Sequence, residues 1–181
     1  MRYADLSDYV RVNPISKIKN IGWLESGFEY EFGAVSDLAL RNLREIGRAS
    51  YPRLYTFNRM RGYHYCSICA VEKFSGEADR PKGNGEILVP DKTNLGSYFA
   101  APALIVHYVE NHAYCPPDEF VRSVECIDLA CEFDAEIAFD ALRLTHEQMV
   151  KLYKSFADQY REIDQPEYSK YRRWLEAHRL L

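Results

Sequence analysis

Five side chains that could bind a metal ion fall in two short stretches of this sequence. His64, Cys66 and Cys69 form the first stretch, and His107 and His112 form the second. Structural zinc sites hold four tetrahedral nitrogen or sulfur ligands, and they commonly take two from a Cys-x-x-Cys turn, where both thiolates can reach one ion. We therefore predict a zinc site formed by Cys66, Cys69, His107 and His112, with His64 as the alternate ligand.

The spacing of the two later histidines requires a helix that ends near the second one. His107 and His112 are five residues apart, which is about 140° of rotation on a regular helix, so the two rings do not share a face. The pair Pro116-Pro117 predicts a helix end close to His112, where a distortion could bring the rings together. Cys115 is a further candidate ligand.

The same residues also have a metal-free interpretation. Free cysteine packs as a small apolar residue, so Cys66 and Cys69 could be ordinary thiols. His112 continues the apolar stripe of Ile105, Tyr108 and Val109, as a hydrogen-bonded core histidine would. If a metal is bound, the sequence favours a closed structural site over a catalytic one.

No catalytic motif accompanies the metal-binding residues. The H-E-x-x-H metalloprotease helix needs its histidines one turn apart, with the glutamate next to the first, and His107, Glu110 and His112 have other spacings. Glu110 is a candidate general base only for the alternative of a zinc-dependent hydrolase with an open metal position. A redox C-x-x-C pair would need a following helix N-terminus, which is not expected here. The sequence therefore favours a protein that is not an enzyme.

The charges of the chain are unevenly distributed, although its formal net charge is only −4. Six acids and no lysine or arginine lie between Glu125 and Asp140, a surface that could dock a basic partner. A basic stretch with interleaved aromatic residues suggests nucleic-acid binding as another alternative, although a solvated helix face and loop is the favoured interpretation. Its arginines are Arg41, Arg44, Arg48, Arg53, Arg59 and Arg61.

The composition is that of a folded protein that stays in the cytoplasm. The chain has 181 residues, of which 47% are hydrophobic and 28% charged, values typical of one globular unit. The first residues lack the apolar segment of a signal peptide, and no apolar run is long enough for a membrane span. In a reducing cytosol, the five cysteines are expected to be thiols or metal ligands.

The apolar periodicity predicts an α+β fold, with a small mixed or antiparallel sheet in the N-terminal two thirds and a helical C-terminal part. Strands are expected within residues 15–33, above all at Phe28–Phe32, and at 86–89 and 98–100. A strand followed by a knuckle-like turn is expected over Gly62–Cys69. A hairpin turn is expected at Gly83–Glu86. Helices are expected at 36–48 (with Ser36 as the N-cap), 102–112, 118–143 (in one piece or two), 146–163 (with Thr145 and Gln148 as a capping box) and 166–178. We expect residues 1–124 to form an α+β domain and 125–181 a helical extension packed on it.

Several segments resemble a family of small uncharacterised bacterial proteins, described as a domain of unknown function. The segments are Ile21–Leu24 (IGWL), Arg61–Cys69 (RGYHYCSIC), Gly83–Ile87 (GNGEI) and Tyr98–Phe120 (YFAAPALIVHYVENHAYCPPDEF). The resemblance covers residues 3–124 and places His64, Cys66, Cys69, His107 and His112 at signature positions. It implies no activity. The clustered Cys/His residues, the charge asymmetry and the absence of a catalytic motif suggest instead a zinc-stabilised protein that binds a macromolecular partner, as an immunity or regulatory protein does. We expect this partner to be another protein.

Overall fold

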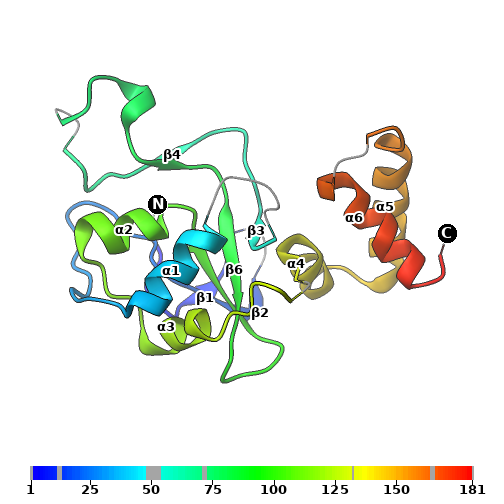
Figure 1. Cartoon of the computed structure of the whole chain (residues 1–181), viewed down its shortest axis with the longest axis horizontal. Helices are drawn as coiled ribbons and strands as arrows, with labels where there is room; N and C mark the ends of the chain where they lie inside the picture. The colour runs from blue at the N-terminus through cyan, green and yellow to red at the C-terminus, as the bar shows by residue number, and fades with distance from the viewer. Residues whose placement is uncertain are drawn as a thin grey trace.

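The computed structural model describes residues 2–11, 14–47, 54–70, 73–131, 133–163 and 166–180. In these ranges it has a mixed five-stranded sheet in the N-terminal part and helices in the C-terminal part (Figure 1), which confirms the predicted α+β class. Its α-helices are α1 (Asp37–Ile46), α2 (Ile105–His112), α3 (Asp118–Glu125), α4 (Ala135–Arg143), α5 (His146–Gln159) and α6 (Pro166–Ala177).

In the central sheet, a strand from the N-terminal residues pairs with the strand that precedes α2. The spatial order is β1 (Asp8–Tyr9), β2 (Ile15–Asn20), β7 (Tyr98–Pro102), β6 (Glu86–Pro90) and β3 (Thr56–Phe57). Strands β2 and β7 run parallel, and the other neighbouring strands are antiparallel.

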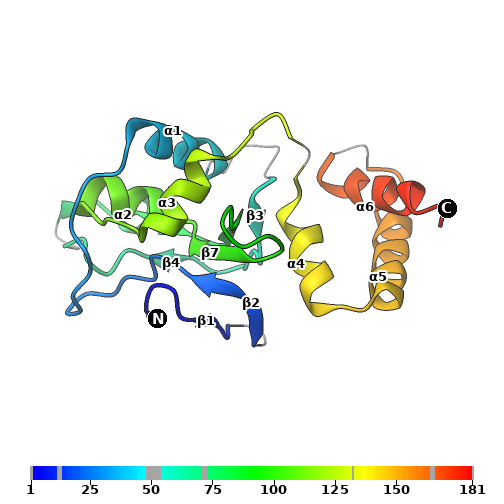
Figure 2. The same ribbon diagram turned by 90° about the horizontal axis from the view of Figure 1, so that it is seen from below.

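The sheet is buried on both faces. Ile87 and Val89 of β6 belong to a core that includes residues of α1, α2 and α3, and these helices lie together on one side of the sheet (Figure 2). Leu88 belongs instead to a second core, which includes Phe57 of the central sheet and Phe139 of α4. Because successive strand side chains point to opposite faces, burial on both faces explains why residues Ile87–Val89 of β6 are all apolar.

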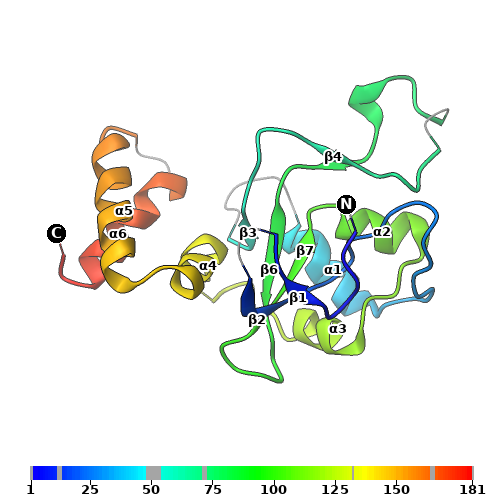
Figure 3. The ribbon, with the colours of Figure 1, turned by 180° about the vertical axis from the view of Figure 1, so that it is seen from behind.

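A two-stranded ribbon lies outside the central sheet. It consists of β4 (His64–Tyr65) and β5 (Lys82–Gly83), paired antiparallel with His64 opposite Gly83 and Tyr65 opposite Lys82. A short 3-10 helix, η2 (Glu77–Asp79), lies in the loop that joins the two strands. The segment containing β4 extends from the body on the side away from α5 and α6 (Figures 1 and 3).

The helical part ends in a hairpin of α5 and α6 with its own small core, in which Met149, Tyr153 and Leu175 are buried. The predicted capping box is confirmed: the Thr145 hydroxyl accepts from the Gln148 backbone N–H, and the Gln148 side chain accepts from the Thr145 backbone N–H. None of the helices in the described ranges is both long and apolar enough to cross a membrane.

Two predictions about strands and turns are wrong. The alternating segment Phe28–Phe32 forms only one isolated bridge, between Phe32 and Tyr114, and the outer side chains Phe28 and Phe32 are 51% and 70% exposed. The alternation of aromatic and acidic residues in this segment therefore does not correspond to a half-buried strand. Gly83–Glu86 is no hairpin turn either, because β5 pairs with β4 whereas β6 pairs with β3 and β7.

The start of α2 also differs from the prediction. Pro102 was expected in the first helical turn, but it is the last residue of β7, and the helix begins at Ile105. The predicted 118–143 helix consists of two pieces, α3 and α4, which is one of the forms expected. The predicted helix end near His112 is present.

Candidate metal centre

The turn after β4 brings both cysteines to the end of the ribbon. The Cys66 backbone N–H donates to the Pro81 carbonyl at 2.9 Å, so the ribbon remains closed up to the first cysteine. The Ser67 hydroxyl accepts from the Ser26 backbone N–H at 3.0 Å, which fixes the turn to the preceding loop. Cys66 is buried and Cys69 is half-buried.

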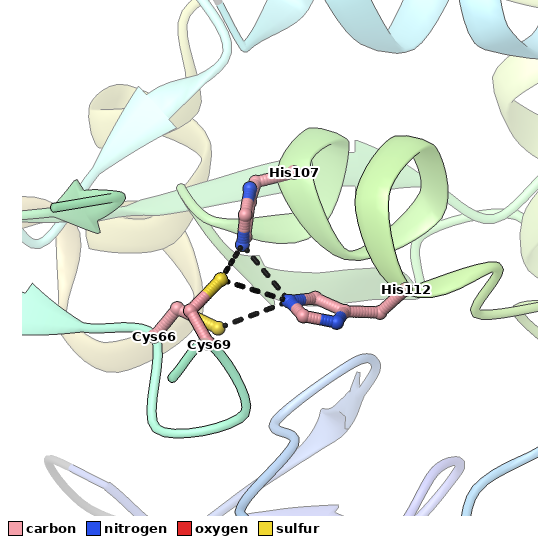
Figure 4. Close-up of side chains that lie close together, drawn as sticks. All are labelled: Cys66, Cys69, His107 and His112. Atoms are coloured by element: carbon pink, nitrogen blue, oxygen red, sulfur yellow. Dashed lines mark hydrogen bonds between the residues drawn. The ribbon is translucent and has the colours of Figure 1, made fainter. Parts of the chain in front are cut away.

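The last two turns of α2 supply the histidines. His112 is the final helical residue, and Ala113 caps the helix in the left-handed conformation with φ 49° and donates its backbone N–H to the Tyr108 carbonyl. The Tyr30 hydroxyl donates to the His112 carbonyl at 3.4 Å. Since His112 lies where the helix ends, its ring reaches the same point as His107 despite the rotation between them (Figure 4).

One ligand atom from each of four residues meets at this point. We call Cys66, Cys69, His107 and His112 the Cys2His2 cluster; their ligand atoms all lie within 4.8 Å of one another. The His112 Nε2 atom lies 3.3 Å from each cysteine sulfur and 3.1 Å from His107 Nε2. The His107 Nε2 atom lies 3.3 Å from the Cys69 sulfur.

These distances fit a tetrahedral ion better than a hydrogen-bonded group. Tetrahedral zinc bonds imply ligand–ligand edges of roughly 3.3 to 3.8 Å, close to the 3.1 and 3.3 Å separations found here. The His112 Nε2 atom has three close neighbours, whereas one ring nitrogen can donate one proton or accept at one lone pair. A central cation would satisfy all these atoms together.

Burial shifts the pKa values of His107, His112 and Cys69. Desolvation first, and then the neighbouring His112, lowers the pKa of His107. Desolvation, followed by Lys73, lowers the pKa of His112. Both rings therefore favour the neutral form that can bind a metal. Desolvation, followed by a hydrogen bond with Cys66, raises the pKa of the Cys69 thiol, and a bound cation would reverse this by favouring the thiolate.

The other candidate ligands lie outside the cluster. The His64 ring packs on Trp23, with ring centroids 6.2 Å apart, and burial lowers its pKa. The Cys115 sulfur contacts the Pro116 carbonyl at 3.9 Å. Glu110, the candidate base, accepts a hydrogen bond from Arg44 Nε of α1 at 2.5 Å, so its carboxylate is already engaged.

The arginine stretch does not form one continuous element. Arg41 and Arg44 lie on α1, whereas Arg59 and Arg61 lie between β3 and β4. The other two predicted members, Arg48 and Arg53, lie outside the described residues.

A set of residues that the sequence analysis did not single out lies on the ribbon beside the cluster. Tyr65 and Lys82 are directly opposite each other across its two strands, and Tyr63 and Arg80 are each two residues away from them. The signal for this set is an alternation with a period of two, Tyr-x-Tyr followed by Arg-x-Lys, which places alternate residues on one face of a strand.

Residues 1–125 match the family model described as a domain of unknown function (DUF7919). The match contains the sheet, the ribbon, α1, α2, α3 and the whole Cys2His2 cluster. Neither a curated protein nor a solved structure matches this chain.

Proposed function

The chain belongs to this family, whose domain has no known function, and we propose from the site itself that it is a zinc-stabilised binding protein. In this proposal one zinc ion, held by the Cys2His2 cluster, joins the end of the ribbon to α2. The protein then acts by binding a macromolecular partner, as an immunity or regulatory protein does, and catalyses no reaction.

The observation that carries the proposal is the convergence of two thiols and two imidazoles from separate elements on one point, with all ligand atoms within 4.8 Å. Two sulfur and two nitrogen ligands are a donor set typical of structural zinc. The ribbon is only two residues per strand, and isolated two-stranded hairpins are marginally stable. A metal bond to α2 would therefore add much of the stability of this segment.

The donor set also argues against the hydrolase alternative. Catalytic zinc keeps a coordination position for water or substrate, and four protein ligands fill a tetrahedral sphere. The candidate base Glu110 is paired with Arg44. A structural role for the ion follows from both points.

The test is the metal content of untagged protein purified without chelators. We expect about one zinc per chain in the wild type and a loss of bound zinc in the double variant Cys66→Ser, Cys69→Ser. The matched control is Cys126→Ser, Cys131→Ser, which changes two exposed thiols and should leave the zinc content unchanged. Full zinc content and thermal stability in the first variant would refute the proposed site.

A further inference from the structure

The two faces of the ribbon are chemically different. One face packs on the body, because the His64 ring lies on Trp23 and a Cβ built at Gly83 would lie only 2.9 Å from the Ala103 Cβ. His64 and Gly83 are directly opposite each other in the ribbon, so they share this inner face. Side chains alternate along a strand, so Tyr65 and Lys82 lie on the outer face.

The outer face combines cations with aromatic rings. Lys82 Nζ lies 5.1 Å from the Tyr63 ring centroid and 5.8 Å from that of Tyr65, and the Arg80 guanidinium lies 4.8 Å from the Tyr65 ring. Tyr63 is 54% exposed. Neither Arg80 nor Lys82 forms an ion pair with an acid among the described residues. We call Tyr63, Tyr65, Arg80 and Lys82 the ribbon patch.

We propose that the ribbon patch binds single-stranded nucleic acid, with unpaired bases stacked on the tyrosine rings and backbone phosphates neutralised by the two cations. Proteins that bind single strands combine stacking aromatic side chains with a positively charged track for the backbone. The patch has both features within a few ångströms, on a segment that extends from the body (Figure 3). Exposed Arg61 precedes the patch along the chain and extends its positive charge.

This inference rests on the proposed zinc site, because the ion would fix the turn that follows β4 and so hold the ribbon in place. The overall charge of the protein is −4, so a nonspecific attraction to polyanions is not expected from the whole molecule. Binding should therefore depend on this local patch. Dependence on the tyrosine rings would also distinguish a nucleic acid held by base stacking from an acidic peptide held by charge alone.

The experiment measures binding of a fluorescein-labelled oligo(dT) and oligo(U), each about 12 nucleotides long, by fluorescence anisotropy across a salt series. We expect Tyr63→Ala to weaken binding about 5- to 100-fold and Tyr63→Phe to retain it. We expect Lys82→Ala to weaken binding and to reduce the slope of log K against log salt by about 0.7. Phe28→Ala and Lys154→Ala are matched controls at exposed positions elsewhere and should have no effect.

The zinc content of each preparation is measured in parallel, so the two proposals can fail separately. Zinc-loaded protein that binds neither oligonucleotide at low salt would overturn the inference and leave the metal site intact. Binding that Tyr63→Ala leaves unchanged, or that polyglutamate displaces as readily as oligonucleotide, would also overturn it. Wild-type protein that is purified without chelators, holds no zinc and still binds through Tyr63 would support the ribbon patch, and its missing zinc would refute the metal site.

Discussion

At the scale of single residues, the clearest loss of folding stability comes from a buried carboxyl group. Glu86 is fully buried, its Oε2 atom has no hydrogen-bond partner among the described residues, and desolvation raises its pKa despite Arg11 nearby. A raised folded pKa means that the native state binds the proton more tightly than the unfolded state. The free energy of unfolding therefore falls as pH rises from the unfolded value toward the folded one.

We predict that Glu86→Gln removes this part of the pH dependence. The glutamine cannot ionise, so the melting temperature of the variant relative to wild type should increase as pH rises from about 4.3. Thermal melts of both proteins from acidic to neutral pH measure the difference. A constant difference across that range would show that Glu86 has no raised pKa in the folded protein.

His64 tests which histidines bind the ion. It lies two residues before Cys66 but packs on Trp23, so we predict that His64→Ala keeps the zinc content of wild type. His107→Ala and His112→Ala should each lose zinc affinity, because each removes a ligand from the cluster. Titration with a competing zinc chelator gives the affinities. Equal losses from all three variants would contradict the assignment.

At the scale of elements, the sequence predicted the parts whose signals are local. The cap at Ser36, the capping box at Thr145 and the apolar runs of β6 and β7 are encoded within a few residues, and the structure has them. The four cluster residues could also be named, because the C-x-x-C turn and the two histidines have metal-ligand types and spacing.

What the sequence could not provide depends on partners far along the chain. The alternation at Phe28–Phe32 predicted a strand, but the segment finds only Tyr114 as a bridge partner. The strand expected before Cys66 is present as β4, but its partner β5 was missed, because two residues are too few to predict a strand from apolar alternation. The sequence favoured His112 but left His64 as the alternate ligand, because excluding it depends on where α2 lies against the ribbon, which no local pattern encodes.

The packing of the ribbon on the body depends on the close approach of Gly83 to Ala103. Its added Cβ would lie 2.9 Å from Ala103 Cβ and 3.3 Å from the Leu104 backbone nitrogen, so Gly83→Ala should push the ribbon off the body. We predict a lower melting temperature and weaker zinc affinity. Gly62→Ala is the control, because its Cβ would meet nothing within 4 Å. An unchanged Gly83→Ala variant would mean that the inner face of the ribbon is not tightly packed.

At the scale of the whole molecule, the residues that match the family model end before the residues that form the core of the sheet. The match stops at residue 125, yet Ala135 and Phe139 of α4 belong to the core that contains Tyr9 and Phe57. The α5–α6 hairpin has a separate core. We infer that α4 completes the family domain in this chain and that the hairpin is the part that can be removed.

Two truncations test this inference. A chain ending at residue 144 should remain folded and keep its zinc, because the Cys2His2 cluster and the cores on both faces of the sheet lie within it. It loses the hairpin core and the contacts of Tyr153, Lys170 and Tyr171 with α4 and its N-cap. A chain ending at residue 125 should be markedly less stable, because it exposes the apolar face of the sheet under α4. Chemical denaturation of both fragments measures the free energies of unfolding. Equal stability of the two would show that α4 is dispensable.

The central claim is that one zinc ion is held by two sulfur and two nitrogen atoms of the Cys2His2 cluster. X-ray absorption at the zinc edge of the purified protein tests it most directly. We predict two sulfur ligands at about 2.3 Å and two nitrogen ligands at about 2.0 Å, with no bound water. A shell without sulfur, or one with an open position occupied by water, would contradict a closed structural site.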